Sequence, residues 1–253
     1  MEEKIKNKKL FGLLGCNISY SFSRQYFVEK FKKEQIKNSE YVNFDILQIE
    51  DFPSIIAKHQ QTLKGMNVTI PYKLAIFPFL DKIDKKAKKI GAVNTIKITK
   101  KGKLKGFNTD YYGFKKSLKP LLKKHHKKAL VLGTGGASKA VAFALKKLDI
   151  KFKFVSRNSK NKKIISYQEL SEKIIDAHTI IINCTPVGVY PKTEELPQIP
   201  YQFLTSKHLL YDLIYNPSET TFLFKGKEQG AIIKNGLEML ELQAEKSWKI
   251  WNY

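Results

Sequence analysis

Cysteine is scarce in this chain of 253 residues. Cys16 and Cys184 are its two cysteines, which are too few for a disulfide framework and show no metal-binding spacing. His125 and His126 stand together among lysines, but the sequence places no further ligand near them. We therefore expect a solvated connection there and no metal site. So little cysteine is typical of the reducing cytoplasm, which is the location we expect.

Arginine and long apolar runs are also missing. Only Arg24 and Arg157 are arginine among 46 basic residues, and the net charge is +23. Such a charge raises a nucleic-acid hypothesis, but the lysines are scattered and arginine is the better residue for bidentate phosphate or guanine contacts. We expect weak, salt-dependent association and no specific nucleic-acid partner. No apolar run could cross a bilayer and the N-terminus is unlike a signal peptide, so we expect no membrane partner.

Short apolar runs alternate with amphipathic stretches along the whole chain, as in α/β proteins. In the first part this pattern predicts strands at 10–14, 41–46 and 66–70, helices at 23–35, 51–63, 74–80, 85–89 and 111–118, and a hairpin of 92–98 with 103–106. In the second part it predicts strands at 129–132, 152–156, 179–183, 208–213 and 231–233, and a final helix at 236–251. Trp248 and Trp251 of that helix are expected to be packing anchors.

A glycine-rich turn at 129–138 follows one of these strands. Gly133 allows a sharp reversal, and Gly135 leaves the backbone open to a bulky ligand. The N–H groups and dipole of the next helix favour a negative group there, which is the arrangement that holds a pyrophosphate. Ser138 replaces the third glycine of the dinucleotide fingerprint, so an ordinary tight turn is the alternative. The strand at 152–156 lies at the spacing of a βαβ unit and favours the dinucleotide interpretation.

Polar clusters stand at the ends of the first strands, where open α/β sheets bind ligands. Serine hydroxyls at a helix N-terminus suit a small carboxylate, and a capped serine-rich loop is the alternative. Lys73 follows a proline turn that can hold it in place. Asp110 begins a helix, where capping is the commoner role. The clusters span 15–23, 67–73, 91–95 and 106–110.

Taken together and in this order, these motifs resemble the shikimate dehydrogenase family over nearly the whole chain. Ser21 and Ser23 match the two serines of the family's substrate loop. Tyr20 stands where the family usually has histidine, and Asn17 and Arg24 stand where proline is common. The other matching segments are Asn67–Lys73, Gly91–Thr95, Asn108–Asp110, Gly133–Ala137, Asn183–Gly188, Asp212–Pro217 and Gly236–Gln243.

The resemblance implies a two-domain α/β fold. Residues 1–109 and 236–253 would form a substrate-binding and catalytic domain with a mostly parallel sheet. Residues 110–235 would form a Rossmann-type dinucleotide-binding domain, and the C-terminal helix would return to the first domain. The partners implied are a small-molecule substrate and, for the chain itself, a monomer or homodimer.

The resemblance also implies a reaction, the NADPH-dependent reduction of 3-dehydroshikimate to shikimate on the route to aromatic amino acids. Lys73 would supply or accept the proton, and Asp110 would orient a ring hydroxyl. We expect these two groups to meet across a cleft opposite the nicotinamide ring. The substrate-binding residues would be Ser21, Ser23, Asn67, Thr69, Asn94, Tyr215 and Gln243. The cofactor-binding residues would be Gly133, Gly135, Gly136, Ala137, Ser156, Arg157, Thr185 and Gly236.

The end of the second strand of the nucleotide domain predicts NADP rather than NAD. NAD-binding folds place an acidic residue there for the ribose 2′-hydroxyl, but this chain has Ser156 and Arg157. Arginine attracts a 2′-phosphate and stacks beside adenine. Lys160 is near enough in sequence to help.

Two other functions are compatible with the sequence. A quinate/shikimate dehydrogenase of broader specificity would carry the same motifs. A non-catalytic Rossmann-fold protein that binds a cofactor or nucleic acid would keep the fold. Lys73 and Asp110 argue against the second, because binding alone requires no proton donor.

Overall fold

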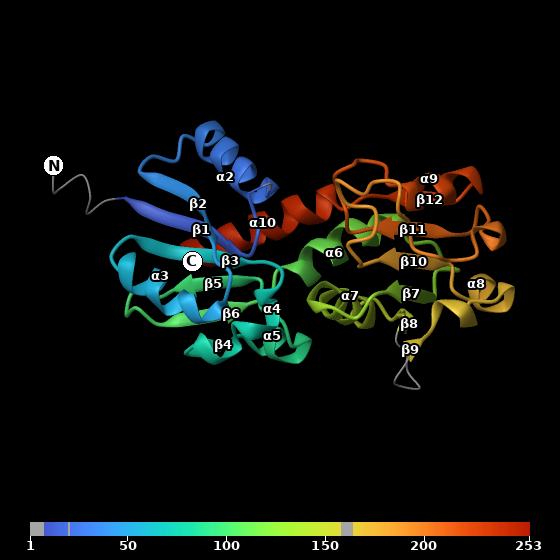
Figure 1. Cartoon of the computed structure of the whole chain (residues 1–253), viewed down its shortest axis with the longest axis horizontal. Helices are drawn as coiled ribbons and strands as arrows, with labels where there is room; N and C mark the ends of the chain where they lie inside the picture. The colour runs from blue at the N-terminus through green and yellow to red at the C-terminus, as the bar shows by residue number, and fades with distance from the viewer. Residues whose placement is uncertain (1–7, 20, 158–163) are drawn as a thin grey trace. The chain divides into compact units, whose positions relative to one another are not determined.

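The computed structural model describes residues 8–19, 21–157 and 164–253 (Figure 1). The chain divides into two compact units, one of Met1–Thr109 with Ala244–Tyr253 and one of Asp110–Gln243. The chain re-enters unit 1 at Ala244, inside the last helix, α10 (Leu237–Asn252), whereas we expected the return at Gly236. Gly113 explains part of this difference, because a Cβ there would lie 2.4 Å from the carbonyl of Met239. The first turns of α10 therefore pack within unit 2.

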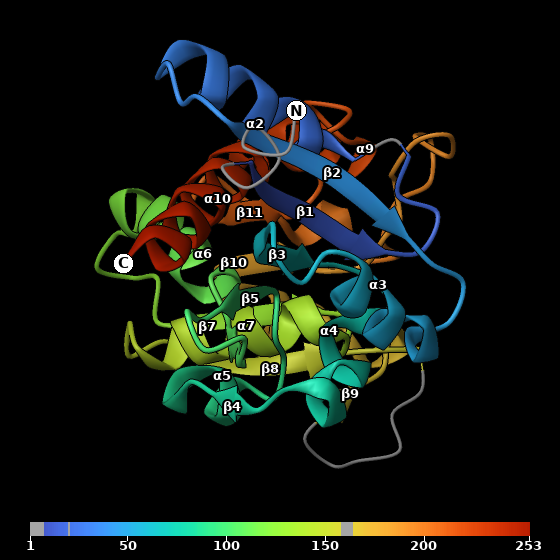
Figure 2. The same cartoon turned by 90° about the vertical axis from the view of Figure 1, so that its left-hand side faces the viewer.

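Within the described residues, unit 1 contains a six-stranded mixed sheet in the order β2-β1-β3-β5-β6-β4 (Figure 2). Neighbours are parallel from β2 to β3 and between β4 and β6, and antiparallel from β3 through β5 to β6. The β5–β6 pair is the hairpin that the sequence predicts. The strands are β1 (Lys9–Gly15), β2 (Ser39–Asp45), β3 (Leu63–Val68), β4 (Lys82–Ile83), β5 (Thr95–Ile98) and β6 (Leu104–Phe107).

Two apolar layers cover this sheet, because successive strand residues point to opposite faces. On one face Leu14 and Met66 pack with Phe52. On the other Phe11 packs with Trp251, so the final helix anchors here as expected. The first layer includes α3 (Phe52–Lys58) and α5 (Lys85–Ile90), and the second includes α2 (Phe22–Lys33) and the end of α10; the short α4 (Tyr72–Ala75) follows β3.

Among its described residues, unit 2 contains a second sheet in which every neighbouring pair is parallel, in the order β12-β11-β10-β7-β8-β9. This is the doubly wound order of dinucleotide-binding folds, and its direction reverses between β7 and β10. The strands are β7 (Lys128–Leu132), β8 (Lys151–Val155), β9 (Ile164–Ile165), β10 (Ile180–Asn183), β11 (Leu209–Asp212) and β12 (Ile232–Lys234).

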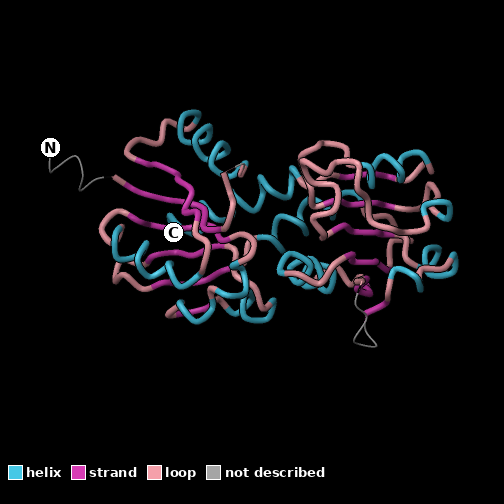
Figure 3. The backbone as a smooth tube through the Cα atoms, viewed as in Figure 1, coloured by secondary structure: helices cyan, strands magenta, loops and turns pink. Residues whose placement is uncertain are grey.

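Helices lie on both faces of this second sheet (Figure 3). Phe114 and Val141 pack on the face that carries Val131, and Phe222 packs on the face that carries Leu130. The alternation of Leu130 and Val131 between the two layers is what a strand buried on both faces requires. The helices are α6 (Asp110–Leu118), α7 (Gly136–Lys146), α8 (Glu172–Ala177) and α9 (Thr221–Glu228).

The two-domain α/β fold class is confirmed, and several local boundaries differ from the prediction. The helix expected at 74–80 is α4 followed by a 3-10 turn at Phe77–Phe79. The helix expected at 51–63 is a 3-10 turn followed by α3, which ends at Lys58. Leu63 instead starts β3 and pairs with Leu10 of β1. The N-cap of α2 is Ser21, not Ser23, and its side chain accepts a hydrogen bond from the backbone N–H of Ser23 at 3.3 Å.

No helix among the described residues is long and apolar enough to cross a membrane. In the same residues no group of three or more His, Cys, Asp or Glu side chains could hold a metal ion. His125 and His126 both turn an imidazole Nε2 towards the carbonyl of Lys207, at 3.0 and 3.2 Å. Both histidines therefore contact the backbone. His125 is exposed, but His126 is buried, so the solvated connection expected here is only partly correct.

Candidate functional site

The serine loop of unit 1 is held by a carboxylate at the end of β2. Asp45 accepts the backbone N–H groups of Asn17 at 2.7 Å and Ile18 at 3.0 Å. The loop then enters α2, where Ser21 caps the helix and Ser23 stands in its first turn, both half-buried. Two hydroxyls beside the first N–H groups of a helix can hold an anion such as a carboxylate. Arg24, next along the chain, is exposed.

Lys73 lies in α4, just beyond the end of β3, and is half-buried. Its carbonyl accepts the backbone N–H of Val93 at 2.8 Å, and the carbonyl of Asn94 accepts the N–H of Val68 at 2.8 Å. Thr69, between them, donates its N–H to the carbonyl of Leu14 at 2.9 Å. The backbone that carries Lys73 and Thr69 is therefore fixed to neighbouring segments.

Asn94 is 3 % exposed, and both polar atoms of its side chain form hydrogen bonds with Thr109. Its Oδ1 accepts the backbone N–H of Thr109 at 2.6 Å, and its Nδ2 donates to Thr109 Oγ1 at 2.9 Å. The next residue is Asp110, the buried first residue of α6. A chain of hydrogen bonds inside unit 1 thus connects the backbone of Lys73, through Val93 and Asn94, to the residue before Asp110.

Asn67 already has protein partners on both sides of its amide. Tyr41 donates its hydroxyl to Asn67 Oδ1 at 2.9 Å, and Asn67 Nδ2 donates to Ser247 Oγ at 2.9 Å. The Ser247 hydroxyl also lies 2.8 Å from Thr95 Oγ1 and 3.1 Å from Thr109 Oγ1. The structure therefore puts Asn67 inside a buried polar network.

Sequence reasoning missed Ser247, the centre of that network. Its hydroxyl is fully buried and joins residues from three separate segments of unit 1. The available signal was helical spacing, because Ser247 lies one turn after Gln243 on the same helix.

The glycine loop of unit 2 follows β7 at the point where the strand order reverses. Gly133 has φ +96°, a backbone conformation that favours glycine. Gly135 is the N-cap of α7 and has no side chain with which to cap that helix. A Cβ on Gly135 would meet none of the described residues within 4 Å. Ser138 is buried and donates its hydroxyl to the carbonyl of Gly135 at 2.7 Å, so a small polar residue serves where the fingerprint has glycine.

Gly136 and Ala137 form the first turn of α7. Their backbone N–H groups belong to the helix end that has no intrahelical partners. With the N-terminal dipole, these groups make the start of α7 a site for phosphate oxygens.

The loop after β10 lies across the reversal point from the glycine loop. Asn183 Oδ1 accepts both the backbone N–H and the hydroxyl of Thr185, at 3.0 and 2.6 Å. Thr185 in turn reaches the glycine loop, since a Cβ on Gly133 would lie 3.1 Å from Thr185 Cγ2. Burial raises the pKa of the neighbouring Cys184 thiol well above its usual value, so this thiol stays protonated.

Arg157 and Ser156 follow β8, as the sequence predicts for the ribose side of a nucleotide site. Arg157 is exposed, and Ser156 donates its N–H to the carbonyl of Ile165 at 3.0 Å. Burial raises the pKa of the Tyr167 hydroxyl, and the positive charge of Arg157 opposes that rise. Lys160 lies outside the described residues.

Tyr215, Gly236 and Gln243 occupy different places in unit 2. Tyr215 is half-buried after β11, and Gln243 is 7 % exposed on α10. A Cβ on Gly236 would lie 2.1 Å from the carbonyl of Leu213, and the N–H of Gly236 donates to the carbonyl of Ile214 at 2.9 Å. Gly236 thus packs directly on the backbone that leads to Tyr215.

The fold and these residues define a class of protein. Unit 2 is a Rossmann-type unit in which a glycine stands at the start of α7, and unit 1 carries a lysine, two helix-start hydroxyls and buried amides. This is the composition of a two-domain dinucleotide-dependent oxidoreductase.

Comparison with known proteins gives the family. The family model described as shikimate dehydrogenase substrate binding domain matches residues 13–96. The shikimate dehydrogenase (NADP(+)) of Methanococcus maripaludis strain C6 is 41% identical over 263 residues, covering 96% of this chain and 91% of that protein. This chain belongs to the shikimate dehydrogenase family.

Solved structures agree with that assignment. The shikimate dehydrogenase of Aquifex aeolicus is 36% identical, with a TM-score of 0.86, over 97% of this chain and 92% of that one. The enzyme of Thermus thermophilus, solved in complex with NADP(H) and shikimate, is 28% identical, with a TM-score of 0.84, over 96% and 93%.

Proposed function

We propose that this protein is an NADP-dependent shikimate dehydrogenase, which reduces 3-dehydroshikimate reversibly to shikimate for aromatic amino acid biosynthesis. The observation that carries the proposal is the hydrogen-bonded path in unit 1 from the backbone of Lys73, through Val93 and Asn94, to Thr109. This path fixes the backbone of Lys73, which carries the ammonium, and of Thr109, the residue before the carboxylate of Asp110. The names of the relatives, shikimate dehydrogenase (NADP(+)), supply the substrate and the cofactor.

The residues of unit 2 fit NADP. The N-cap of α7 is Gly135, which has no side chain, and a Cβ there would meet none of the described residues within 4 Å. Gly133, Gly136, Ala137 and Thr185 would line the pyrophosphate side. Arg157 is exposed and able to pair with a 2′-phosphate, with Ser156 beside it. NADP, when bound, supplies or accepts the hydride.

The chain's own residues would bind and orient the substrate and move the proton. Lys73 donates a proton to the carbonyl oxygen during reduction and accepts it from the hydroxyl during oxidation. Asp110 orients a ring hydroxyl of the substrate. Ser21 and Ser23 hold the carboxylate. The other substrate contacts are assigned to Thr69, Asn94, Tyr215 and Gln243.

Asn67 and Gly236 would act mainly by supporting other groups. The amide of Asn67 is engaged by Tyr41 and Ser247, and Gly236 holds the backbone before Tyr215. The two free cysteines fit the reducing cytoplasm, where we place the reaction. We propose that the enzyme acts on its small-molecule substrate as a monomer or a homodimer.

The test is NADP⁺ reduction with shikimate and quinate assayed side by side. We expect shikimate to be oxidised with a much higher kcat/KM than quinate. Lys73→Ala should lower kcat by about a hundredfold or more with an unchanged melting temperature, because a general acid–base group is lost. Lys85→Ala, which removes an exposed lysine of α5, is the matched control. A wild-type protein that does not oxidise shikimate overturns the proposal, and normal turnover by Lys73→Ala removes that lysine from the mechanism.

A further inference from the structure

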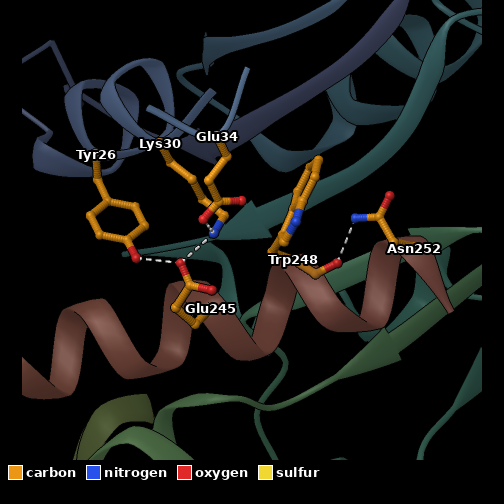
Figure 4. Close-up of polar contacts among 6 residues, drawn as sticks. All are labelled: Tyr26, Lys30, Glu34, Glu245, Trp248 and Asn252. Carbon is orange, nitrogen blue, oxygen red and sulfur yellow. Dashed lines mark hydrogen bonds and ion pairs between the residues drawn. The ribbon is translucent and has the colours of Figure 1, made fainter. Parts of the chain in front are cut away.

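A cluster of charged and polar side chains joins α2 to α10 inside unit 1 (Figure 4). Glu245 Oε1 accepts the Tyr26 hydroxyl at 2.6 Å and the Lys30 ammonium at 2.7 Å. Lys30 also pairs with Glu34, one turn further along α2, at 2.6 Å. Two successive turns of α2 are therefore bound to a single carboxylate of α10.

This cluster is more than a surface ion pair, because its cation is shielded from water. The Lys30 side chain is 7 % exposed, whereas those of Glu245 and Glu34 are 37 % and 48 % exposed. Burial opposes the charge on Lys30, but the hydrogen bonds that Lys30 donates to Glu245 and Glu34, with their negative charges, outweigh it and raise the Lys30 pKa. The same bonds lower the pKa of Glu245 against the effect of its own burial. Removing Glu245 would leave a nearly buried ammonium with one partner, which is costly.

Aromatic contacts also join these two helices. Phe31 packs against Trp248 with ring centroids 5.3 Å apart, and Phe27 against Trp251 at 5.4 Å. This packing holds α2 on the sheet. The bonds of Glu245 are directional and add a constraint on the position of α2 along its own axis.

The position of α2 matters because its first turn carries the serines. Ser21 caps the helix and Ser23 follows, while Tyr26 lies about one turn beyond Ser23. A helix moves as a rigid rod over so short a distance. Any shift of the turn that carries Tyr26 therefore displaces both hydroxyls.

We propose that Glu245 is a positioning residue, which binds Tyr26 and Lys30 and so holds α2 where Ser21 and Ser23 meet the substrate carboxylate. The proposal rests on the proposed function, because shikimate supplies that carboxylate. In this proposal Glu245 contacts no substrate atom. Its effect on catalysis passes entirely through the two serines.

Glu245→Gln tests the proposal, since the amide keeps the size of the side chain and removes its charge. We expect KM for shikimate to rise about tenfold, as a hydrogen bond to a charged ligand is weakened. The kcat and KM for NADP⁺ should stay within about twofold. Lys30→Met should raise KM for shikimate similarly. Lys103→Met, which removes the ammonium bound to Asp81 at 2.8 Å elsewhere in unit 1, should change no constant.

A double-mutant cycle separates positioning from a general structural role. If Glu245 acts through the serines, Glu245→Gln should add little to the KM of a Ser23→Ala protein, because the hydroxyl it places is already gone. Fully additive effects on KM would overturn the proposal. If Glu245→Gln fails to fold, Tyr26→Phe takes its place in the cycle, with an expected rise in KM of about threefold.

The outcomes distinguish the two proposals. Wild-type protein that oxidises shikimate, with KM raised by Ser23→Ala and unchanged by Glu245→Gln, rejects the role of Glu245 alone. Wild-type protein inactive on shikimate rejects the proposed function. A lower melting temperature of Glu245→Gln with an unchanged KM also counts against positioning.

Discussion

Asp212 is expected to make the unfolding free energy of unit 2 depend on pH, and this dependence can be predicted quantitatively. This carboxylate at the end of β11 is fully buried. It accepts hydrogen bonds from Thr220 Oγ1 at 2.7 Å, the N–H of Ile214 at 3.0 Å and Asn183 Nδ2 at 3.1 Å. Burial outweighs these bonds and raises the pKa of Asp212 from 3.8 to about 6. The ionised carboxylate therefore destabilises the fold at neutral pH.

The size and sign of the effect follow from proton linkage. Between pH 4 and 6 the folded protein binds a proton on Asp212 that the unfolded chain has released, so stability falls as pH rises. Below this window both states are protonated, and above it both are ionised. A difference of about 2 units in pKa corresponds to about 3 kcal/mol of unfolding free energy lost across the window.

Asp212→Asn should remove this pH dependence, because an amide of the same size cannot ionise. Denaturant unfolding of both proteins from pH 4 to 7 measures it, followed by circular dichroism, since both tryptophans belong to unit 1. The free energy of wild type minus that of Asp212→Asn should fall by about 3 kcal/mol up to pH 6 and then stay level. Asp149→Asn, which changes an exposed carboxylate of unit 2, is the control. A difference that does not change with pH would refute the reasoning.

Other predictions concern the nucleotide site. Arg157→Ala should raise KM for NADPH at least tenfold and KM for NADH little, because a 2′-phosphate contact is lost; equal effects on both would reject the assignment. Gly135→Ala should leave the melting temperature unchanged but raise KM for NADP⁺, because its Cβ would enter the open space beside α7. Gly133→Ala should instead lower unfolding free energy by about 1–2 kcal/mol, because φ is +96° there, and a calorimetric melt measures it. Equal melting temperatures for the two glycine variants would contradict this distinction.

Local chemistry made part of the structure predictable. A buried strand, a glycine turn and a small-residue helix at 129–138 depend on contacts within about ten residues, and all three appear as expected. The hairpin of β5 and β6 and the parallel sheet of unit 2 could also be predicted. The alternation of apolar and polar residues and the spacing of strands and helices along the chain encode them. Trp251 was correctly expected to be a packing anchor, and it is 6 % exposed.

Other features depend on partners far away in the chain. The helix expected at 51–63 ends early because Leu63 pairs with Leu10 of β1. The sequence offers Asn67 as a substrate-binding amide, and in the structure its polar atoms bond to Tyr41 and Ser247. No window of sequence around Asn67 contains those two residues, so its hydrogen bonds could not be foreseen from its neighbours.

The sequence by itself determined the family, the two kinds of sheet and the residue types offered for proton transfer and phosphate binding, because order and spacing of motifs carry that information. Only the tertiary structure decided which polar groups are already occupied and which residues hold the others in place. Glu245 and Ser247 are ordinary helix residues in the sequence. They become anchors because folding brings the end of α10 against α2 and β3, where buried polar groups must find partners.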